Sequence, residues 1–180
     1  TGHGIQAALS TMIIKNEYDK IKKVDIKVNN ILKILNNSFL GNYIKLDIFF
    51  TCICVDLDLK NNKIHLSSAG HPAQYIISEG EIHQVKAGGT IIGILENIDY
   101  ELITRDFNSK DKILLFTDGL FEEFSKEAVE LGEKGLEHIF EKSKDMDIKE
   151  LIKFVVNEVN EWSKDVCVND DICLIGIERK

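Results

Sequence analysis

The sequence lacks the features that mark membrane-spanning, secreted and nucleic-acid-binding proteins. Its formal net charge of -8 over 180 residues argues against a surface for nucleic acid. Its longest apolar run, around residues 48–55, is far shorter than the roughly 20 residues of a membrane-spanning helix. Pro72 is its one proline, and we find no proline-rich linker, internal repeat, low-complexity tract or signal peptide. These absences predict a soluble cytoplasmic protein, or the cytosolic domain of a membrane-anchored protein.

Cysteine is scarce as well, and the spacing of the four cysteines matches no Cys-x-x-Cys metal or redox motif. Cys52 and Cys54 alternate along a predicted strand, whereas Cys167 and Cys173 lie on either side of an acidic pair near the end of the chain. We therefore expect reduced thiols in the core or in strands, as is usual in the cytosol.

The composition is otherwise that of one globular domain. Hydrophobic residues make up 44% of the chain and charged residues 29%, which carries no signature of disorder. We assign residues 1–180 to a single domain. The first residue is Thr1 rather than Met, and it lies directly inside a Gly-His-Gly turn. We therefore expect the chain to be the C-terminal, larger part of a longer domain.

Apolar residues at helical spacing predict four helices. They are expected over residues 5–14, from Asp25 to Gly41, around residues 136–140 and from Asp147 onward. Asp147 is followed three residues later by Glu150, a start that resembles a capping box. The apolar stripe of this last helix is interpreted as ordinary core.

Alternating and continuous apolar runs predict seven strands. They are expected over residues 47–59, 63–68, 73–78, 81–85, 100–106, 112–117 and 172–177. We expect the first four to form an antiparallel meander. The glycine-rich residues 87–93 predict a loop or flap, and their spacing matches neither nucleotide-binding fingerprint.

One predicted strand ends at an Asp-Gly pair that needs an explanation. Residues 113–116 are a continuous apolar run, typical of a strand buried on both faces, and Asp118-Gly119 follow after one threonine. A carboxylate beside such a run is costly unless it is hydrogen-bonded, paired or bound to a metal, and the glycine allows close approach of backbone or ligand. The alternative is an Asp-Gly turn that closes a hairpin.

A second acidic position, Asp170-Asp171, directly precedes the last predicted strand. It repeats the arrangement at Asp118, an acid at the edge of a sheet, and adjacent like charges favour a cation between them. Mg²⁺ and Mn²⁺ take oxygen ligands, and two such ions can activate a bridging water for attack on phosphorus. Alone, the pair would be better explained as a solvated turn; together with Asp118 it predicts a metal site.

Five short motifs occur in a fixed order along essentially the whole chain. They are Gly2-His3-Gly4 with Ala7-Ala8, Ser68-Ala69-Gly70-His71 with Ala73, Gly89 with Gly93, Thr117-Asp118-Gly119-Leu120 with Glu122, and Asp170-Asp171-Ile172. In order and spacing they resemble the bacterial metal-dependent serine/threonine phosphatases of the family of stage II sporulation protein E and the regulator-of-sigma-factor phosphatases. That family is distantly related to the type-2C phosphatases.

The resemblance implies an α+β fold, an α-β-β-α sandwich of two mostly antiparallel sheets flanked by helices, incomplete here at its N-terminus. It also implies a centre of two Mn²⁺ or Mg²⁺ ions at the sheet edges. By motif match, Asp118 and Asp170 would be the catalytic metal ligands, and Asp171 a neighbour that orients the site or the alternate ligand. Glu122 and His71 match positions that carry ligands of an accessory third metal in type-2C relatives.

The same resemblance implies structural or switch roles for Gly2, Gly4 and Gly119. The helix after Gly4 resembles the element that regulatory domains reposition to switch these phosphatases on. In the family, an Asp two residues before the position of Thr1 bridges both metals. Its absence, with that of the strands before it, predicts a weakly active or inactive fragment that self-associates, for example as a homodimer.

We interpret the chain as the catalytic domain of a serine/threonine protein phosphatase in signal transduction. Its substrate would be a phosphorylated regulatory protein, such as an anti-sigma-factor antagonist in sigma-factor regulation, and its other partner an upstream regulatory or sensor domain. Two alternatives stay open. One is a non-catalytic binding module with the same fold, against which the clustered acids argue. The other is a phosphohydrolase of small molecules, which no nucleotide-binding pattern supports.

Overall fold

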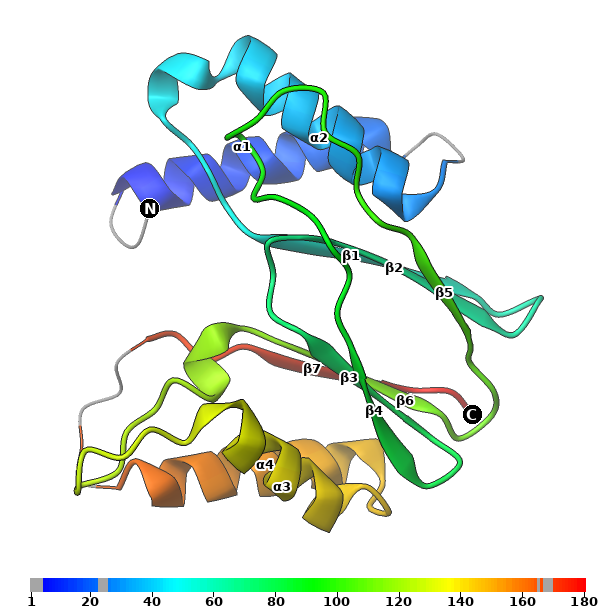
Figure 1. Ribbon diagram of the computed structural model, residues 1–180, viewed down its shortest axis with the longest axis vertical. Coiled ribbons are helices and arrows are strands. Elements are labelled where there is room, and N and C mark those ends of the chain that lie inside the picture. Colours follow the sequence, from blue (N-terminus) through cyan, green and yellow to red (C-terminus); the bar gives the residue numbers. More distant parts are fainter. Residues whose placement is uncertain (1–4, 23–25, 165, 167–169) are drawn as a thin grey trace. The chain divides into compact units, whose positions relative to one another are not determined.

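The structure of the chain, a computed structural model, describes residues 5–22, 26–164, 166 and 170–180 (Figure 1). Its elements fall into two compact units, Thr1–His71 with Lys86–Asp106 and Pro72–Val85 with Phe107–Lys180. Each unit has one antiparallel sheet and two α-helices, in agreement with the α+β class that the resemblance implies. No helix in these described ranges is long and apolar enough to cross a membrane. The assignment of residues 1–180 to a single domain stays a prediction.

The first unit is a three-stranded sheet in the order β1-β2-β5, with two helices beside it (Figure 1). Its elements are α1 Ile5–Ile21, α2 Val28–Asn42, the 3₁₀ turn η1 Ile44–Leu46, β1 Cys52–Asp58, β2 Lys63–Ala69 and β5 Ile103–Asp106. The apolar stripe predicted for α2 is buried, from Val28 to Phe39, and joins one core with Ala69 and Tyr100. Helical spacing alone therefore identified the buried face of this helix.

The second unit is a four-stranded sheet in the order β4-β3-β6-β7, with α3 and α4 beside it (Figure 1). Its elements are β3 Gln74–Ser78, β4 Glu81–Val85, β6 Lys112–Phe116, the 3₁₀ turn η2 Asp118–Leu120, α3 Gly132–Ser143, α4 Ile148–Trp162 and β7 Leu174–Glu178. The predicted start of α4 is confirmed, because the Asp147 carboxylate accepts the backbone N–H groups of Lys149 and Glu150. The predicted stripe of α4 is buried at Leu151, Val155 and Val159.

The predicted four-strand meander is wrong. β1 pairs with β2 and β3 pairs with β4, but β2 and β3 lie in different sheets. The link between them contains Gly70, with φ of 67°, and Pro72, which has no N–H for a ladder. This link therefore ends β2 and starts a strand of another sheet instead of making a tight hairpin.

Several strand boundaries also differ from the predicted ones. β1 begins at Cys52 rather than at residue 47, because η1 precedes it and Asp47 adopts a left-handed conformation with φ of 48°. β5 begins at Ile103 rather than at residue 100. β7 occupies Leu174–Glu178, later than the predicted 172–177.

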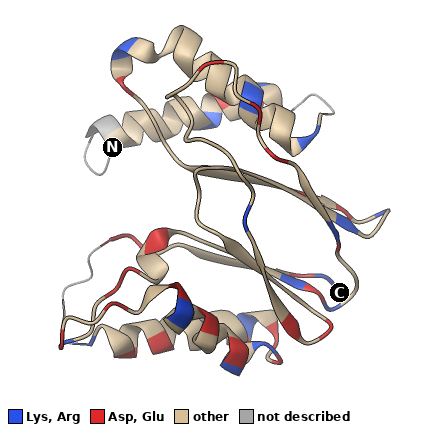
Figure 2. Cartoon of the chain, viewed as in Figure 1, with Lys and Arg blue, Asp and Glu red and all other residues tan. Residues whose placement is uncertain are grey.

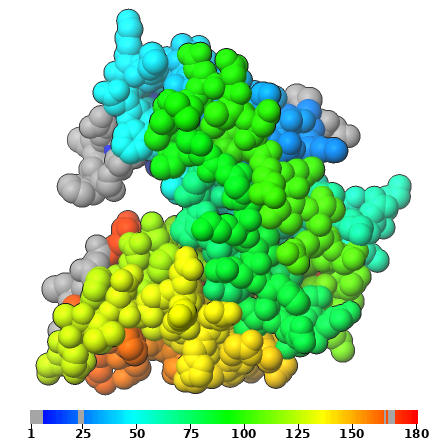
Figure 3. All heavy atoms as spheres, viewed as in Figure 1, coloured from blue at the N-terminus to red at the C-terminus, as the bar shows by residue number. Residues whose placement is uncertain are grey.

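The glycine-rich segment 87–93 is a loop, as predicted, and it is held in place by close backbone contacts. A Cβ at Gly89 would lie 2.1 Å from the Ser68 carbonyl oxygen, and a Cβ at Gly93 would lie 2.5 Å from the Ile48 carbonyl oxygen. The buried Asn36 side chain accepts the Gly93 N–H and donates to the Leu95 carbonyl. Figure 3 shows the segment after α2, in cyan, and this loop, in green, side by side on the first unit.

The cysteines that the structure describes are free thiols, as predicted. Burial raises the pKa of the Cys52 thiol to about 12 and that of Cys54 to about 11. Both thiols are therefore protonated near neutral pH and poorly suited to redox or metal chemistry. Cys167 lies outside the described residues.

Candidate active site

Asp118 follows β6 as the sequence predicts, but it does not close a hairpin. β6 pairs with β3 on one side and with β7 on the other, and its Ile113 and Leu114 are fully buried. Asp118 opens the 3₁₀ turn η2, in which its carbonyl accepts the N–H of Phe121 at 2.9 Å. The hairpin interpretation of the Asp-Gly pair is therefore wrong, and the acid lies at the end of a buried central strand.

Backbone and hydroxyl hydrogen bonds tie the acidic pair to the end of β6. The N–H of Thr117 donates to the Cys173 carbonyl at 3.1 Å, which extends the β6–β7 ladder by one residue. The Thr117 hydroxyl accepts the Cys173 N–H at 3.0 Å and donates to the Asp171 carbonyl at 3.2 Å. These bonds bring Asp118 and the segment of Asp170 to the same edge of the sheet.

Gly119 is required at this edge by close approach rather than by an unusual φ. A Cβ at this position would lie 2.7 Å from the Asp171 carbonyl oxygen and 3.5 Å from the carbonyl carbon of Asp170. Any other residue would therefore push the acidic segment away from Asp118. This contact would be the physical basis of the structural role predicted for Gly119, and that role stays a prediction.

The acidic side chains near η2 influence one another electrostatically. Desolvation raises the pKa of Glu122, and the negative charges of Asp118, Glu130 and Asp170 raise it further. Glu122 follows Asp118 by one helical turn, and its N–H donates to the Asp118 carbonyl at 3.0 Å. Figure 2 shows acidic residues, in red, on η2 and just before β7. The mutual repulsion of these carboxylates would be relieved by a cation.

The donor set fits a hard divalent ion in its chemistry, because the acids offer only carboxylate oxygens. Within the described part of the chain, however, no group of three or more His, Cys, Asp or Glu side chains is arranged to hold a metal ion. The carboxylates are near one another without forming a closed coordination shell. Asp118, Asp170, Asp171 and Glu122 therefore stay predicted ligands.

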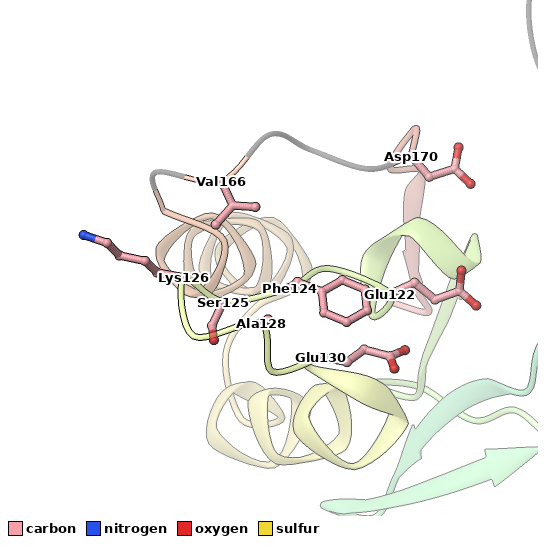
Figure 4. Close-up of a pocket in the computed structure, with 8 residues that line it drawn as sticks. All are labelled: Glu122, Phe124, Ser125, Lys126, Ala128, Glu130, Val166 and Asp170. Carbon is pink, nitrogen blue, oxygen red and sulfur yellow. The ribbon is translucent and has the colours of Figure 1, made fainter.

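A cavity of about 710 Å³ opens beside these acids (Figure 4). The residues of its lining that matter here are Glu122, Phe124, Ala128, Glu130, Val166 and Asp170. Sequence reasoning missed Glu130 and Phe124, since no strand was predicted over residues 121–132. The four residues Phe121-Glu122-Glu123-Phe124 do not alternate in polarity, so the alternation of buried and exposed side chains appears only in the structure.

His71 belongs to the first unit, in the turn that follows β2. Its Nδ1 lies 3.2 Å from the Thr51 hydroxyl, and its backbone N–H donates to the Ser68 hydroxyl at 3.1 Å. These contacts suit a structural histidine, and its predicted role at an accessory metal rests on the motif alone. Gly2 and Gly4 lie outside the described residues, so their predicted switch roles stay predictions.

Comparison with known proteins identifies the family. The family described as Stage II sporulation protein E (SpoIIE) matches residues 1–180. Phosphoserine phosphatase RsbU of Bacillus subtilis is 26% identical over 181 residues, covering 99% of this chain and 53% of RsbU. Phosphoserine phosphatase RsbP of the same organism is also 26% identical, over 125 residues, covering 67% of this chain and 31% of RsbP.

Solved structures share the fold. The SiaA-PP2C domain of Pseudomonas aeruginosa superposes with a TM-score of 0.88 at 20% identity, covering 100% of this chain and 73% of that one. The PP2C phosphatase domain of SpoIIE from Bacillus subtilis, solved with a fragment of its regulatory domain, superposes with a TM-score of 0.80 at 20% identity. This match covers 99% of this chain and 52% of that one. The chain spans about half the length of RsbU and of that SpoIIE structure. With a family match over its whole length, the chain belongs to the stage II sporulation protein E family.

Proposed function

We propose that this chain is the catalytic part of a metal-dependent serine/threonine protein phosphatase that acts on a phosphorylated regulatory protein in the cytoplasm. The observation that carries the proposal is the joining of Asp118 to the Asp170-Asp171 segment through Thr117 and Gly119. Two relatives that match much or all of the chain, RsbU and RsbP, are named phosphoserine phosphatases. Membership of their family makes the same reaction class the best supported one.

In this proposal Asp118 and Asp170 hold Mn²⁺ or Mg²⁺, two ions in the intact domain, and Asp171 orients the site or replaces Asp170 as a ligand. When bound, such ions stabilise negative charge that develops on a phosphoryl group in transfer. The chain supplies their position: the Thr117 hydroxyl fixes the acidic segment, and Gly119 lets it approach η2. Asp170 also accepts the N–H of Asp171 at 2.7 Å, which orients its carboxylate.

The partners follow from the same proposal. The substrate would be a phosphorylated regulatory protein such as an anti-sigma-factor antagonist, and an upstream regulatory domain would act on α1. This helix exposes Leu9 and Met12 by 55% and 68% of their surface, beside the half-buried Ile13. Apolar side chains exposed on one helix are available to a regulatory partner or to a second copy of the chain.

Hydrolysis assays on the intact protein test the proposal. We expect p-nitrophenyl phosphate and a phosphoserine peptide to be hydrolysed with added Mn²⁺ or Mg²⁺ and not in excess chelator. Asp118→Asn should remove most of this activity without unfolding the protein, because it withdraws a ligand charge and no core volume. Asp145→Asn, which changes an exposed acid of the same unit, is the matched control. Full activity of Asp118→Asn or in chelator would contradict the metal assignment, and no activity of any kind would favour a non-catalytic binding module.

A further inference from the structure

The segment between η2 and α3 is a small hairpin that the sequence did not predict. Two hydrogen bonds join its strands at the end away from the turn. The N–H of Gly132 donates to the Phe121 carbonyl and the N–H of Leu131 donates to the Glu123 carbonyl, both at 2.9 Å. Phe124 and Glu130 form an antiparallel bridge farther in, and the N–H of Ser125 donates to the carbonyl of Val129 near the tip. These hydrogen bonds give the segment a defined register.

The register decides which side chains share a face, because alternate residues of a strand point to opposite sides. Phe121, Glu123 and Leu131 are buried. Glu122 and Phe124 point the other way, and Glu130 is the residue directly opposite Phe124. Residues opposite each other in such a bridge have Cβ atoms about 5 Å apart. The hairpin therefore presents an aromatic ring beside two carboxylates.

This face lines the cavity that also contains Asp170 (Figure 4). In the close-up, the carboxylates of Glu122 and Glu130 are directed to the same side, with the Phe124 ring beside them. Phe124 is 36% exposed, and Ala128 continues the apolar lining. The one basic residue of the described lining, Lys126, directs its ammonium away from these acids.

An aromatic ring next to carboxylates is chemically complementary to a lysine or arginine side chain. The aliphatic stem of such a side chain covers apolar surface, and its cationic head can lie over a ring or pair with carboxylates. A metal ion would use only the carboxylates and would leave the apolar part of the lining without a role.

We propose that Phe124 and Glu130 bind a lysine or arginine side chain that flanks the phosphorylated residue of the protein substrate. The proposal rests on the phosphatase function proposed above, because Asp170, a predicted ligand of the reaction centre, lines the same cavity. Phe124 and Glu130 are specificity-determining residues in this proposal and take no part in the chemistry.

The test is a set of phosphoserine peptides of equal length that carry arginine, alanine or glutamate at each flanking position in turn. Hydrolysis by the intact protein with Mn²⁺ is measured for the wild type, Glu130→Gln, Phe124→Ala and Glu130→Lys. The control variant is Glu127→Gln, an exposed acid of the same loop that does not line the cavity. Thermal unfolding of each variant monitors folding, and p-nitrophenyl phosphate reports activity without any flanking residue.

We expect arginine peptides to exceed glutamate peptides in kcat/KM by roughly five- to tenfold at one or more positions, as for a partly exposed charge pair. Glu130→Gln and Phe124→Ala should reduce this preference through KM, by roughly two- to fivefold, and Glu130→Lys should favour the glutamate peptides. Hydrolysis of p-nitrophenyl phosphate, which has no flanking residue, should change by a smaller factor than hydrolysis of the arginine peptides in all three variants, and it should be unchanged in Glu127→Gln.

Two results would overturn the inference while leaving the phosphatase function intact. One is equal hydrolysis of all peptides by the wild type. The other is an equal loss in Glu130→Gln for peptides and p-nitrophenyl phosphate, which would make Glu130 part of the reaction centre. Absence of hydrolysis of every substrate, p-nitrophenyl phosphate included, would instead overturn the proposed function and the inference with it.

Discussion

Replacing Gly119 with alanine should show how far the activity of the candidate active site depends on the position of the Asp170-Asp171 segment, apart from any loss of fold stability. The new Cβ would lie 2.7 Å from the Asp171 carbonyl oxygen, whereas ordinary contacts begin at 3.4 Å. The Asp170-Asp171 segment or η2 must therefore retreat by about 0.7 Å. The clashing atom is a backbone carbonyl oxygen that also accepts a hydrogen bond from the Thr117 hydroxyl. The clash therefore cannot be relieved by moving a flexible side chain.

The expected losses follow from that displacement. Forcing a methyl group into a packed contact costs about 1–3 kcal/mol of stability. Ligand distances at a metal site tolerate only about 0.2 Å of error, so a shift of this size should weaken binding. Displacing groups that position metal ligands typically costs about 10–100-fold in affinity or activity. We therefore expect Mn²⁺-dependent hydrolysis by Gly119→Ala to fall at least tenfold.

The assay combines urea unfolding with a Mn²⁺ titration of p-nitrophenyl phosphate hydrolysis by the intact protein. Gly41→Ala is the control, since no heavy atom lies within 4 Å of a Cβ at that helical position. It should leave activity unchanged and stabilise α2 by up to about 1 kcal/mol. Wild-type Mn²⁺ affinity and turnover in Gly119→Ala would refute the view that this glycine sets the distance between Asp118 and the acidic pair.

The remaining predictions concern ligand assignment and stability. Asp170→Asn should weaken Mn²⁺ binding more than Asp171→Asn does; a titration with the reverse order would move the ligand one residue along the chain. The salt bridge with Lys20, followed by hydroxyl hydrogen bonds, lowers the pKa of the buried Glu17 carboxyl. Because the folded pKa is depressed, the stabilisation is present above pH 4.5 and is lost as the pH falls through the folded pKa. The free energy of unfolding of Glu17→Gln, measured with urea at pH 7, should therefore be about 1–3 kcal/mol lower than that of the wild type. If this difference does not shrink on acidification, the charge-based explanation is contradicted. The buried hydroxyl of Tyr100 has no hydrogen-bond partner in the described part of the chain. Tyr100→Phe should therefore leave the free energy of unfolding unchanged or raise it slightly in the same assay. A decrease of more than about 1 kcal/mol would show that the hydroxyl has a partner.

Local patterns predicted the elements whose environment is set by neighbouring residues. The apolar run of residues 113–116 was read correctly as a buried strand, because the side chains on both faces of β6 are buried or half-buried. The start of α4 was correct because an N-cap depends on the side chain of Asp147 and the next three backbone N–H groups. The family resemblance then singled out Asp118 and Asp170, and the structure brings their backbone segments together.

The predictions failed where pairing between distant residues decides the outcome. A period of two indicates that strands exist but not which strands pair, so β1 to β4 were joined into one meander instead of being divided between two sheets. The hairpin of Phe124 and Glu130 was missed because its segment mixes acids and apolar residues without a clear turn motif.

The sequence by itself determined the helical stripes, most of the strands and the acids that end or precede two of them, because these depend on residue type and local spacing. Only the tertiary structure decided that Thr117 and Gly119 hold the Asp170-Asp171 segment against η2, although Thr117 and Asp171 are 54 residues apart in the chain. It also decided that Glu130 faces the same cavity as Asp170. In both cases residues that are far apart in the chain come close together on folding, and a sequence pattern does not give the distance between such residues.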